Sequence, residues 1–183
     1  MIILKTELDI LKDVTENLSS LNVHYMLTGS LAMMYYSQPR MTRDIDIVIE
    51  LSKIQIENFV RIFENGYYIS PEAIKDSIEH PFMFNLIHLG SSIKIDFVIR
   101  KSEEYRIVEF NRRRKVKFSG IELFIVSKED LILSKLSWAK DSDSELQKRD
   151  IKNLLTSTYD KEYLFEWAKK LDLYDFLMSV KDE

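Results

Sequence analysis

The chain of 183 residues contains no cysteine, which excludes disulfides, catalysis by a thiolate and zinc sites built on cysteine. Histidine is scarce too, and His24, His80 and His88 lack the spacing of a metal-binding motif. No apolar run approaches the length that crosses a bilayer, and the N-terminal residues carry acids where a signal peptide needs positive charge. We therefore expect a cytoplasmic protein that does not enter a membrane.

An excess of positive charge is also lacking, since the formal net charge is −4. Such a surface does not attract nucleic acid as a whole. The run Arg112-Arg113-Arg114-Lys115 is the local exception. It can be a solvated strand edge that discourages edge-to-edge pairing, or it can be a patch that binds RNA.

The pattern of apolar residues predicts an α/β protein with a mixed, twisted sheet, flanking helices and a helical C-terminal region. We expect residues 1–126 to form the core and residues 127–183 to form helices packed on it. Expected strands are 23–28, 44–49, 67–70, 82–89, 92–100, 116–118 and 121–126. Expected helices are 6–20, 31–36 with Ser30 as N-cap, 52–65, 71–79, 103–110, 131–139, 145–157, 160–170 and 173–181.

The strongest chemical signal lies in the strand expected at residues 44–49, with the sequence Asp-Ile-Asp-Ile-Val-Ile. Side chains alternate between the two faces of a strand, so Asp44 and Asp46 point the same way and the isoleucines between them point into the core. Two acids on one face repel each other unless a proton or a cation lies between them. Mg²⁺ is commonly held by one or two carboxylates together with substrate phosphates, and a divalent metal is therefore the natural partner of this pair.

A third carboxylate, Asp96, projects from another strand that is otherwise built for a core. Neighbouring strands lie about 4.8 Å apart, so carboxylates on one face can bridge two metal ions about 3.5–4 Å apart. The turn at Gly29 and Ser30 leads into a helix, whose N-terminus offers free N–H groups to phosphates. Together these parts suit metal-assisted phosphoryl or nucleotidyl transfer.

This arrangement resembles the DNA polymerase β-like nucleotidyltransferase superfamily. The resemblance rests on Gly29-Ser30, on the segment Arg40-x-Thr42-x-Asp44-Ile45-Asp46, and on Asp96 in Lys-Ile-Asp-Phe. The segment 127–136, Ser-Lys-Glu-Asp-Leu-Ile-Leu-Ser-Lys-Leu, is similar to small prokaryotic members such as AbiEii-type toxins and antibiotic nucleotidyltransferases. The resemblance covers roughly residues 23–155.

The resemblance implies catalytic and metal-binding roles for Asp44, Asp46 and Asp96. The first two would hold Mg²⁺, for which Mn²⁺ could substitute, and Asp96 would complete the metal site and orient or deprotonate the acceptor hydroxyl. The implied nucleotide-binding residues are Gly29, Ser30, Arg40, Thr42 and Lys135. Asp150 follows a basic pair in the next helix, where family members often have an acid, and its role stays open.

The implied function is Mg²⁺-dependent transfer of a nucleoside monophosphate from an NTP such as ATP to a hydroxyl. The acceptor is a tRNA or other RNA 3′ end, a protein or a small molecule, and the protein can be the toxin of a pair with an antitoxin partner. The alternative is a catalytically idle relative that binds a nucleotide or a partner protein. A phosphohydrolase is disfavoured because no histidine joins the carboxylates.

Overall fold

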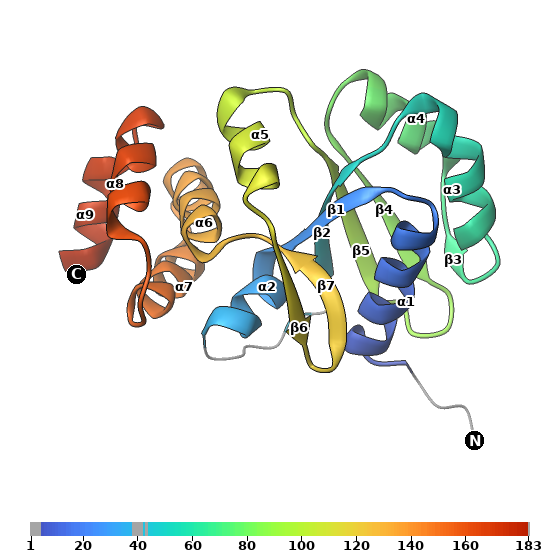
Figure 1. Ribbon diagram of the computed structural model, residues 1–183, viewed down its shortest axis with the longest axis horizontal. Coiled ribbons are helices and arrows are strands. Elements are labelled where there is room, and N and C mark those ends of the chain that lie inside the picture. Colours follow the sequence, from blue (N-terminus) through green and yellow to red (C-terminus); the bar gives the residue numbers. More distant parts are fainter. Residues whose placement is uncertain (1–4, 38–41, 43, 183) are drawn as a thin grey trace.

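The computed structural model describes residues 5–37, 42 and 44–182 (Figure 1). Its strands form a seven-stranded mixed sheet in the order β3-β4-β5-β2-β1-β7-β6. The strands are β1 (His24–Thr28), β2 (Asp44–Glu50), β3 (Tyr67–Tyr68), β4 (Met83–His88), β5 (Lys94–Ile99), β6 (Arg114–Phe118) and β7 (Ile121–Ile125). The α/β fold class predicted from the sequence is confirmed.

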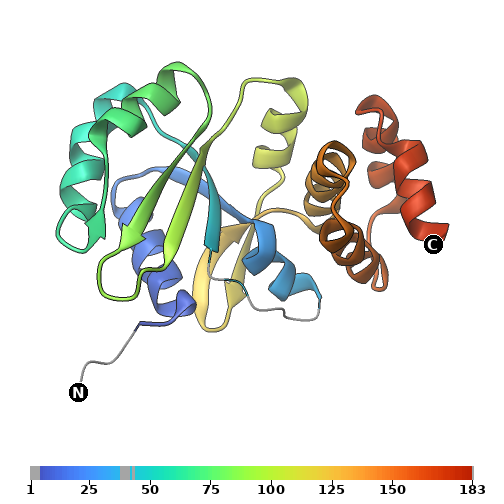
Figure 2. The same cartoon turned by 180° about the vertical axis from the view of Figure 1, so that it is seen from behind.

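The helices flank the sheet and continue into the C-terminal region. They are α1 (Glu7–Ser20), α2 (Gly29–Tyr36), the 3-10 turn η1 (Lys53–Gln55), α3 (Ile56–Phe63), α4 (Pro71–Glu79), α5 (Glu104–Asn111), α6 (Lys128–Ser142), α7 (Glu145–Leu155), α8 (Lys161–Lys170) and α9 (Tyr174–Asp182). Seen from behind, α8 and α9 lie farthest from the sheet, with α6 and α7 between them and the core (Figure 2). No helix in the described ranges is long and apolar enough to cross a membrane.

The alternation predicted for β2 is confirmed. Ile45, Ile47 and Ile49 are fully buried on one face, where α1 and α3 cover the sheet (Figure 1). Asp44 and Asp46 lie on the opposite face, which is turned toward α2 and α6. The apolar face thus anchors the strand and leaves its carboxylates on the side that is less tightly covered.

The strand register brings the predicted acids side by side. β2 lies between β1 and β5, antiparallel to the first and parallel to the second. Asp46 is paired with Thr28 across one side and with Asp96 across the other. Asp44 is paired with Lys94. Two acids 50 residues apart in the sequence are therefore direct neighbours in the sheet.

Local details differ from the sequence predictions at two places. The N-cap of α2 is Thr28, not Ser30, which lies within the first turn. The segment expected as one helix after Ser52 begins with η1 before α3, and Ser52 and Gln55 form a capping box there. A capping box fixes both ends of the first turn and is compatible with 3-10 geometry.

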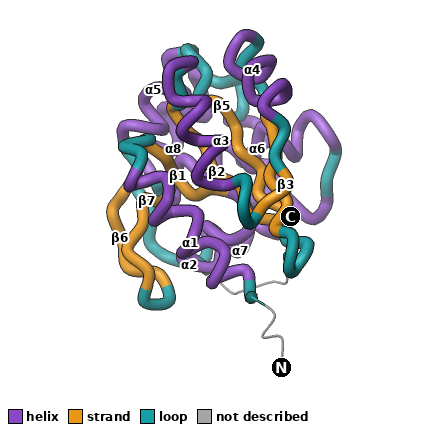
Figure 3. Tube along the Cα trace, turned by 90° about the vertical axis from the view of Figure 1, so that its right-hand side faces the viewer, coloured by secondary structure: helices purple, strands orange, loops and turns teal. Residues whose placement is uncertain are grey.

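The basic run 112–115 does not form a single exposed patch. Arg112 and Arg113 fold inward: Arg112 donates to Asp130, and Arg113 stacks over the ring of Phe110. Arg114 and Lys115 belong to β6, which lies at one edge of the sheet, opposite β3 (Figure 3).

Candidate functional site

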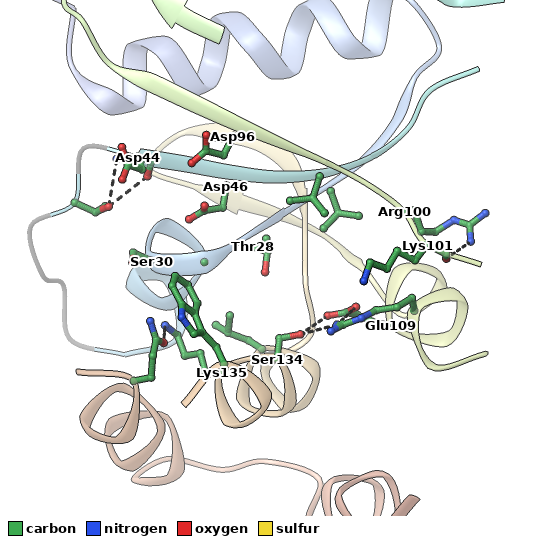
Figure 4. Close-up of a pocket in the computed structure, with 18 of the residues that line it drawn as sticks. Thr28, Ser30, Asp44, Asp46, Asp96, Arg100, Lys101, Glu109, Ser134 and Lys135 are labelled. Atoms are coloured by element: carbon green, nitrogen blue, oxygen red, sulfur yellow. Dashed lines mark hydrogen bonds and ion pairs between the residues drawn. The ribbon is translucent and has the colours of Figure 1, made fainter. Parts of the chain in front are cut away.

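A cleft of about 690 Å³ lies between the acid-bearing face of the sheet and the helices α6 and α7 (Figure 4). Its lining includes almost every residue that the sequence singled out: Gly29, Ser30, Thr42, Asp44, Asp46, Asp96 and Lys135. Arg40 lies outside the described residues. The structure thus gathers residues from β1, α2, β2, β5 and α6 around one space.

Asp46 lies against the start of α2. A Cβ added to Gly29 would meet the Asp46 carboxylate oxygen at 2.0 Å, and Gly29 has a φ of +64°, in the left-handed region. Both facts require glycine here, since a side chain would be strained and would displace the carboxylate. The backbone N–H of Ser30 donates to Asp46. The turn therefore positions this carboxylate in addition to opening a helix toward the cleft.

The environment of Asp46 disfavours a negative charge. Burial, followed by the like charges of Asp96 and Asp44, raises the pKa of Asp46 to about 6, while Lys135 and the N–H of Ser30 lower it. A carboxylate whose pKa is raised by its acidic neighbours lies where a cation would be strongly stabilised.

Asp96 is the most deeply buried of the three acids, and its side chain is 9% exposed. One oxygen, Oδ2, accepts from Lys94 Nζ at 2.8 Å, and this contact is the main cause that raises the pKa of Lys94. The other oxygen, Oδ1, is buried and has no hydrogen-bond partner among the described residues. An unsatisfied buried carboxylate oxygen is costly and points to a missing ligand.

Asp44 lies at the open end of the cleft, where its backbone is tied to Thr42. The N–H of Asp44 donates to Thr42 Oγ1 at 3.4 Å, and that hydroxyl donates to the Asp44 carbonyl at 3.3 Å (Figure 4). Thr42 thus fixes the start of β2. Asp44 is the exposed member of the acid trio.

The donor set fits a divalent cation such as Mg²⁺. Carboxylate oxygens are its preferred protein ligands, and the Oδ1 atom of Asp96 and the high pKa of Asp46 both indicate uncompensated negative charge. No three His, Asp or Glu side chains within the described ranges form a complete metal cluster. A bound Mg²⁺ would therefore take further ligands from water and substrate phosphates, as it commonly does.

Lys135 enters the cleft from α6 and is anchored by α7. Its Nζ donates to Asp150 Oδ2 at 2.8 Å and to Gln147 Oε1 at 2.9 Å. The Lys135 and Asp150 side chains are 5% and 0% exposed. The open question about Asp150 thus has a structural answer: it holds the lysine of the cleft.

A second buried network lines the far part of the cleft, near the end of β5. Glu109 accepts from Arg106 Nη1 at 2.8 Å and from Ser134 Oγ at 2.7 Å. Burial raises the pKa of Glu109, although Arg106 opposes the shift.

The sequence reasoning did not assign Lys94, Gln147, Trp138 or the Glu109 network to the site. One signal was available: Leu131, Ser134, Lys135 and Trp138 have the i, i+3, i+4, i+7 spacing of one helix face, and all four line the cleft. Glu109 on α5 and Gln147 on α7 have no comparable spacing pattern in the sequence, because their contacts with α6 depend on tertiary packing.

A family model described as a nucleotidyltransferase of unknown function (DUF6036) matches residues 4–177. No curated protein matches the chain.

Several solved structures share the fold. The lincosamide antibiotic adenylyltransferase LnuA, lincomycin-bound, is 18% identical with a TM-score of 0.58, over 84% of this chain and 98% of that chain. ANT(2″)-Ia in complex with adenylyl-2″-tobramycin is 16% identical with a TM-score of 0.57, over 93% and 95%. An antigenic nucleotidyltransferase-like protein from Paracoccidioides brasiliensis is 19% identical with a TM-score of 0.56, over 96% and 92%.

Proposed function

The chain belongs to this nucleotidyltransferase family, and we propose that it transfers a nucleoside monophosphate from an NTP to a hydroxyl acceptor and releases pyrophosphate. The observation that carries the proposal is the grouping of Asp44, Asp46 and Asp96 on one wall of a cleft whose other wall presents Lys135. Acids alone would repel a triphosphate, and a cation bound by them would attract it.

In the proposed reaction the acceptor oxygen attacks the α-phosphorus of the NTP. The bond from that phosphorus to the oxygen bridging it to the β-phosphate breaks, and pyrophosphate leaves with the bonding electrons. The proton of the acceptor hydroxyl passes to Asp96, whose Oδ1 lacks a partner among the described residues. A general base must be within hydrogen-bond reach of that proton, and Asp96 faces the cleft.

Asp44 and Asp46 would hold Mg²⁺, with Asp96 completing the site, and Mn²⁺ could substitute. When bound, Mg²⁺ would neutralise charge on the phosphate oxygens. Gly29 and Ser30 position the Asp46 carboxylate. Gly29 lets this carboxylate approach the backbone closely, and the N–H of Ser30 donates to it.

The β- and γ-phosphates would lie between the first turn of α2 and Lys135. The N–H of Ser30 is already bonded to Asp46, so the dipole and the other N–H groups at the N-terminus of α2 would favour phosphate. Lys135 is kept in the cleft by Asp150 and Gln147. Thr42 supports the start of β2. The role predicted for Arg40 in phosphate binding stays a prediction.

The acceptor is proposed more broadly, as a small-molecule, RNA or protein hydroxyl. The structures of LnuA and ANT(2″)-Ia contain lincomycin and adenylyl-2″-tobramycin, which favours testing small molecules first. The inward-facing Arg112 and Arg113 weaken the case for an RNA surface on the basic run. A toxin role with an antitoxin partner stays a prediction from the resemblance.

The test is a transfer assay with each α-³²P-NTP, Mg²⁺ and three acceptor pools: total RNA, cell protein and a small-molecule extract. Asp96→Asn and a surface control, Glu166→Gln, are run beside the wild-type chain. We expect label on one pool with the wild type and with Glu166→Gln, and none with Asp96→Asn. Label on no pool, with NTP binding still detected by a rise in Tm, would instead support the idle relative.

A further inference from the structure

The cleft contains one aromatic side chain among its described lining residues, Trp138. This side chain is 60% exposed, on a chain whose other tryptophan, Trp167, is 8% exposed. A large aromatic surface left open inside a cleft is the kind of feature that marks a binding site.

Trp138 shares the cleft-facing surface of α6 with Lys135. The two residues are three positions apart, so they lie on the same helix face about 4.5 Å apart along its axis. Leu146, at the start of α7, lines the same cleft and is 43% exposed. Polar phosphate-binding groups and an apolar platform thus adjoin each other, as the two ends of a nucleotide require.

We propose that Trp138 is the stacking platform for the base of the donor nucleotide, with Leu146 as a flanking apolar contact. This inference rests on the proposed function, because it places the NTP phosphates near Lys135 and α2. Nucleobases stack on aromatic rings, and every base has a face that can do so. We therefore expect all four NTPs to bind, with discrimination among them coming from other groups.

The two tryptophans make the inference directly measurable. Trp167 lies on α8, outside the cleft lining. There it packs against Tyr105, with ring centroids 5.1 Å apart. A base stacked on Trp138 should quench the fluorescence of that residue and leave that of Trp167 unchanged. Inorganic tripolyphosphate, which offers phosphates without a base, should bind with Mg²⁺ and leave the fluorescence unchanged.

The variants separate stacking from general binding. Trp138→Phe keeps a ring, so ATP should bind within about threefold of the wild-type Kd, and the quenching should disappear. Trp138→Ala should raise the Kd for ATP about tenfold, the order expected for one lost base–aromatic stack, and leave the Kd for tripolyphosphate unchanged. Phe82→Ala removes another exposed aromatic, 69% exposed and outside the cleft lining, and should change neither Kd.

Three results would overturn the inference. Unchanged ATP affinity in Trp138→Ala would reject the platform while the proposed function stands. An equal loss of affinity for ATP and tripolyphosphate would show that Trp138 supports the cleft and does not contact the base. Absence of ATP binding to the wild-type chain, by calorimetry with Mg²⁺, would reject both this inference and the proposed function.

Discussion

Carboxylates lie on the sheet wall of the cleft and behind its helical wall, and the surroundings of Asp130 and Asp46 differ most. Behind the helical wall Asp150, on α7, meets Lys135 at 2.8 Å, and Asp130, in the first turn of α6, accepts from Ser127, Arg112 and Tyr163. On the sheet wall burial, followed by the like charges of Asp96 and Asp44, raises the pKa of Asp46, and the neighbouring Asp96 has a cation, Lys94, at 2.8 Å.

This contrast separates Asp130, whose two oxygens both accept hydrogen bonds inside the fold, from Asp46, whose negative charge is opposed by burial and by like charges. A carboxylate with cations and hydroxyl groups around it is satisfied in the folded chain, and removing it leaves those partners buried and unpaired. A carboxylate among other carboxylates destabilises the metal-free fold, so its place in the molecule calls for another explanation. Under the proposed function, this place serves to bind a cation that carries substrate phosphates.

The largest effect we expect is on catalysis, from Asp96→Asn. Loss of the acceptor-activating carboxylate should lower the rate of transfer by about 10²–10⁴-fold, the range of general-base catalysis. Circular dichroism and a thermal melt of the same sample would show whether the fold is kept. Wild-type rates in this variant would remove Asp96 from the proposed mechanism.

Asp130→Ala tests a carboxylate that stabilises the fold. Asp130 is fully buried, and its loss leaves Arg112 and Tyr163 without their shared partner. We expect about 3–5 kcal/mol of lost stability by urea unfolding, with transfer by the folded protein within a few-fold of wild type. Glu166→Gln, in an exposed pair with Lys170, is the matched control and should cost under about 1 kcal/mol.

Asp150→Asn should have an intermediate effect, because asparagine keeps the shape and one acceptor oxygen. Losing the charge-assisted bond to Lys135 should cost about 1.5–3 kcal/mol. If Asp150 positions Lys135 for phosphate, KM for the NTP should rise more than kcat falls. A fall in kcat at unchanged KM would instead assign Lys135 to the chemical step.

The smallest effect we expect is a gain in stability from Asp46→Asn without added metal. The pKa of Asp46 is about 6 in the fold against an ordinary value of 3.8. Ionisation therefore destabilises the fold increasingly as the pH rises from about 4 to about 6, and fully above that. The variant should melt about 2–4 °C higher at pH 7.5, the shift that 1 kcal/mol gives in a chain of this size. The gain in Tm should vanish near pH 4. A lower Tm than wild type at pH 7.5 would contradict the conclusion that the charge of Asp46 destabilises the metal-free fold.

Sequence reasoning located the sheet wall well, because its signals are local. A period of two placed the isoleucines of β2 in the core and its acids together, and the turn after β1 was visible as Gly29-Ser30. The pairing of Asp46 with Asp96 required the strand order, and it agrees with the prediction of neighbouring strands.

The helical wall could be predicted only in part. Lys135 is recognisable in the sequence as a cation on an apolar helix. Its bonds to Gln147 and Asp150 are not, because they depend on how α7 packs against α6. The placement of Ser30 as N-cap was wrong because Gly29, with its positive φ, already begins the helix after Thr28. Local propensity gives the type of an element more reliably than its ends.

The proposed function requires that an NTP is cleaved between its α- and β-phosphates in the cleft. The most direct test follows γ-³²P-ATP incubated with the protein, Mg²⁺ and a heat-treated cell extract as the source of acceptor. We predict that the label appears in pyrophosphate with the wild-type chain and not with Asp96→Asn. Label in orthophosphate, formed by the wild type and lost in the variant, would show a phosphohydrolase and contradict the account.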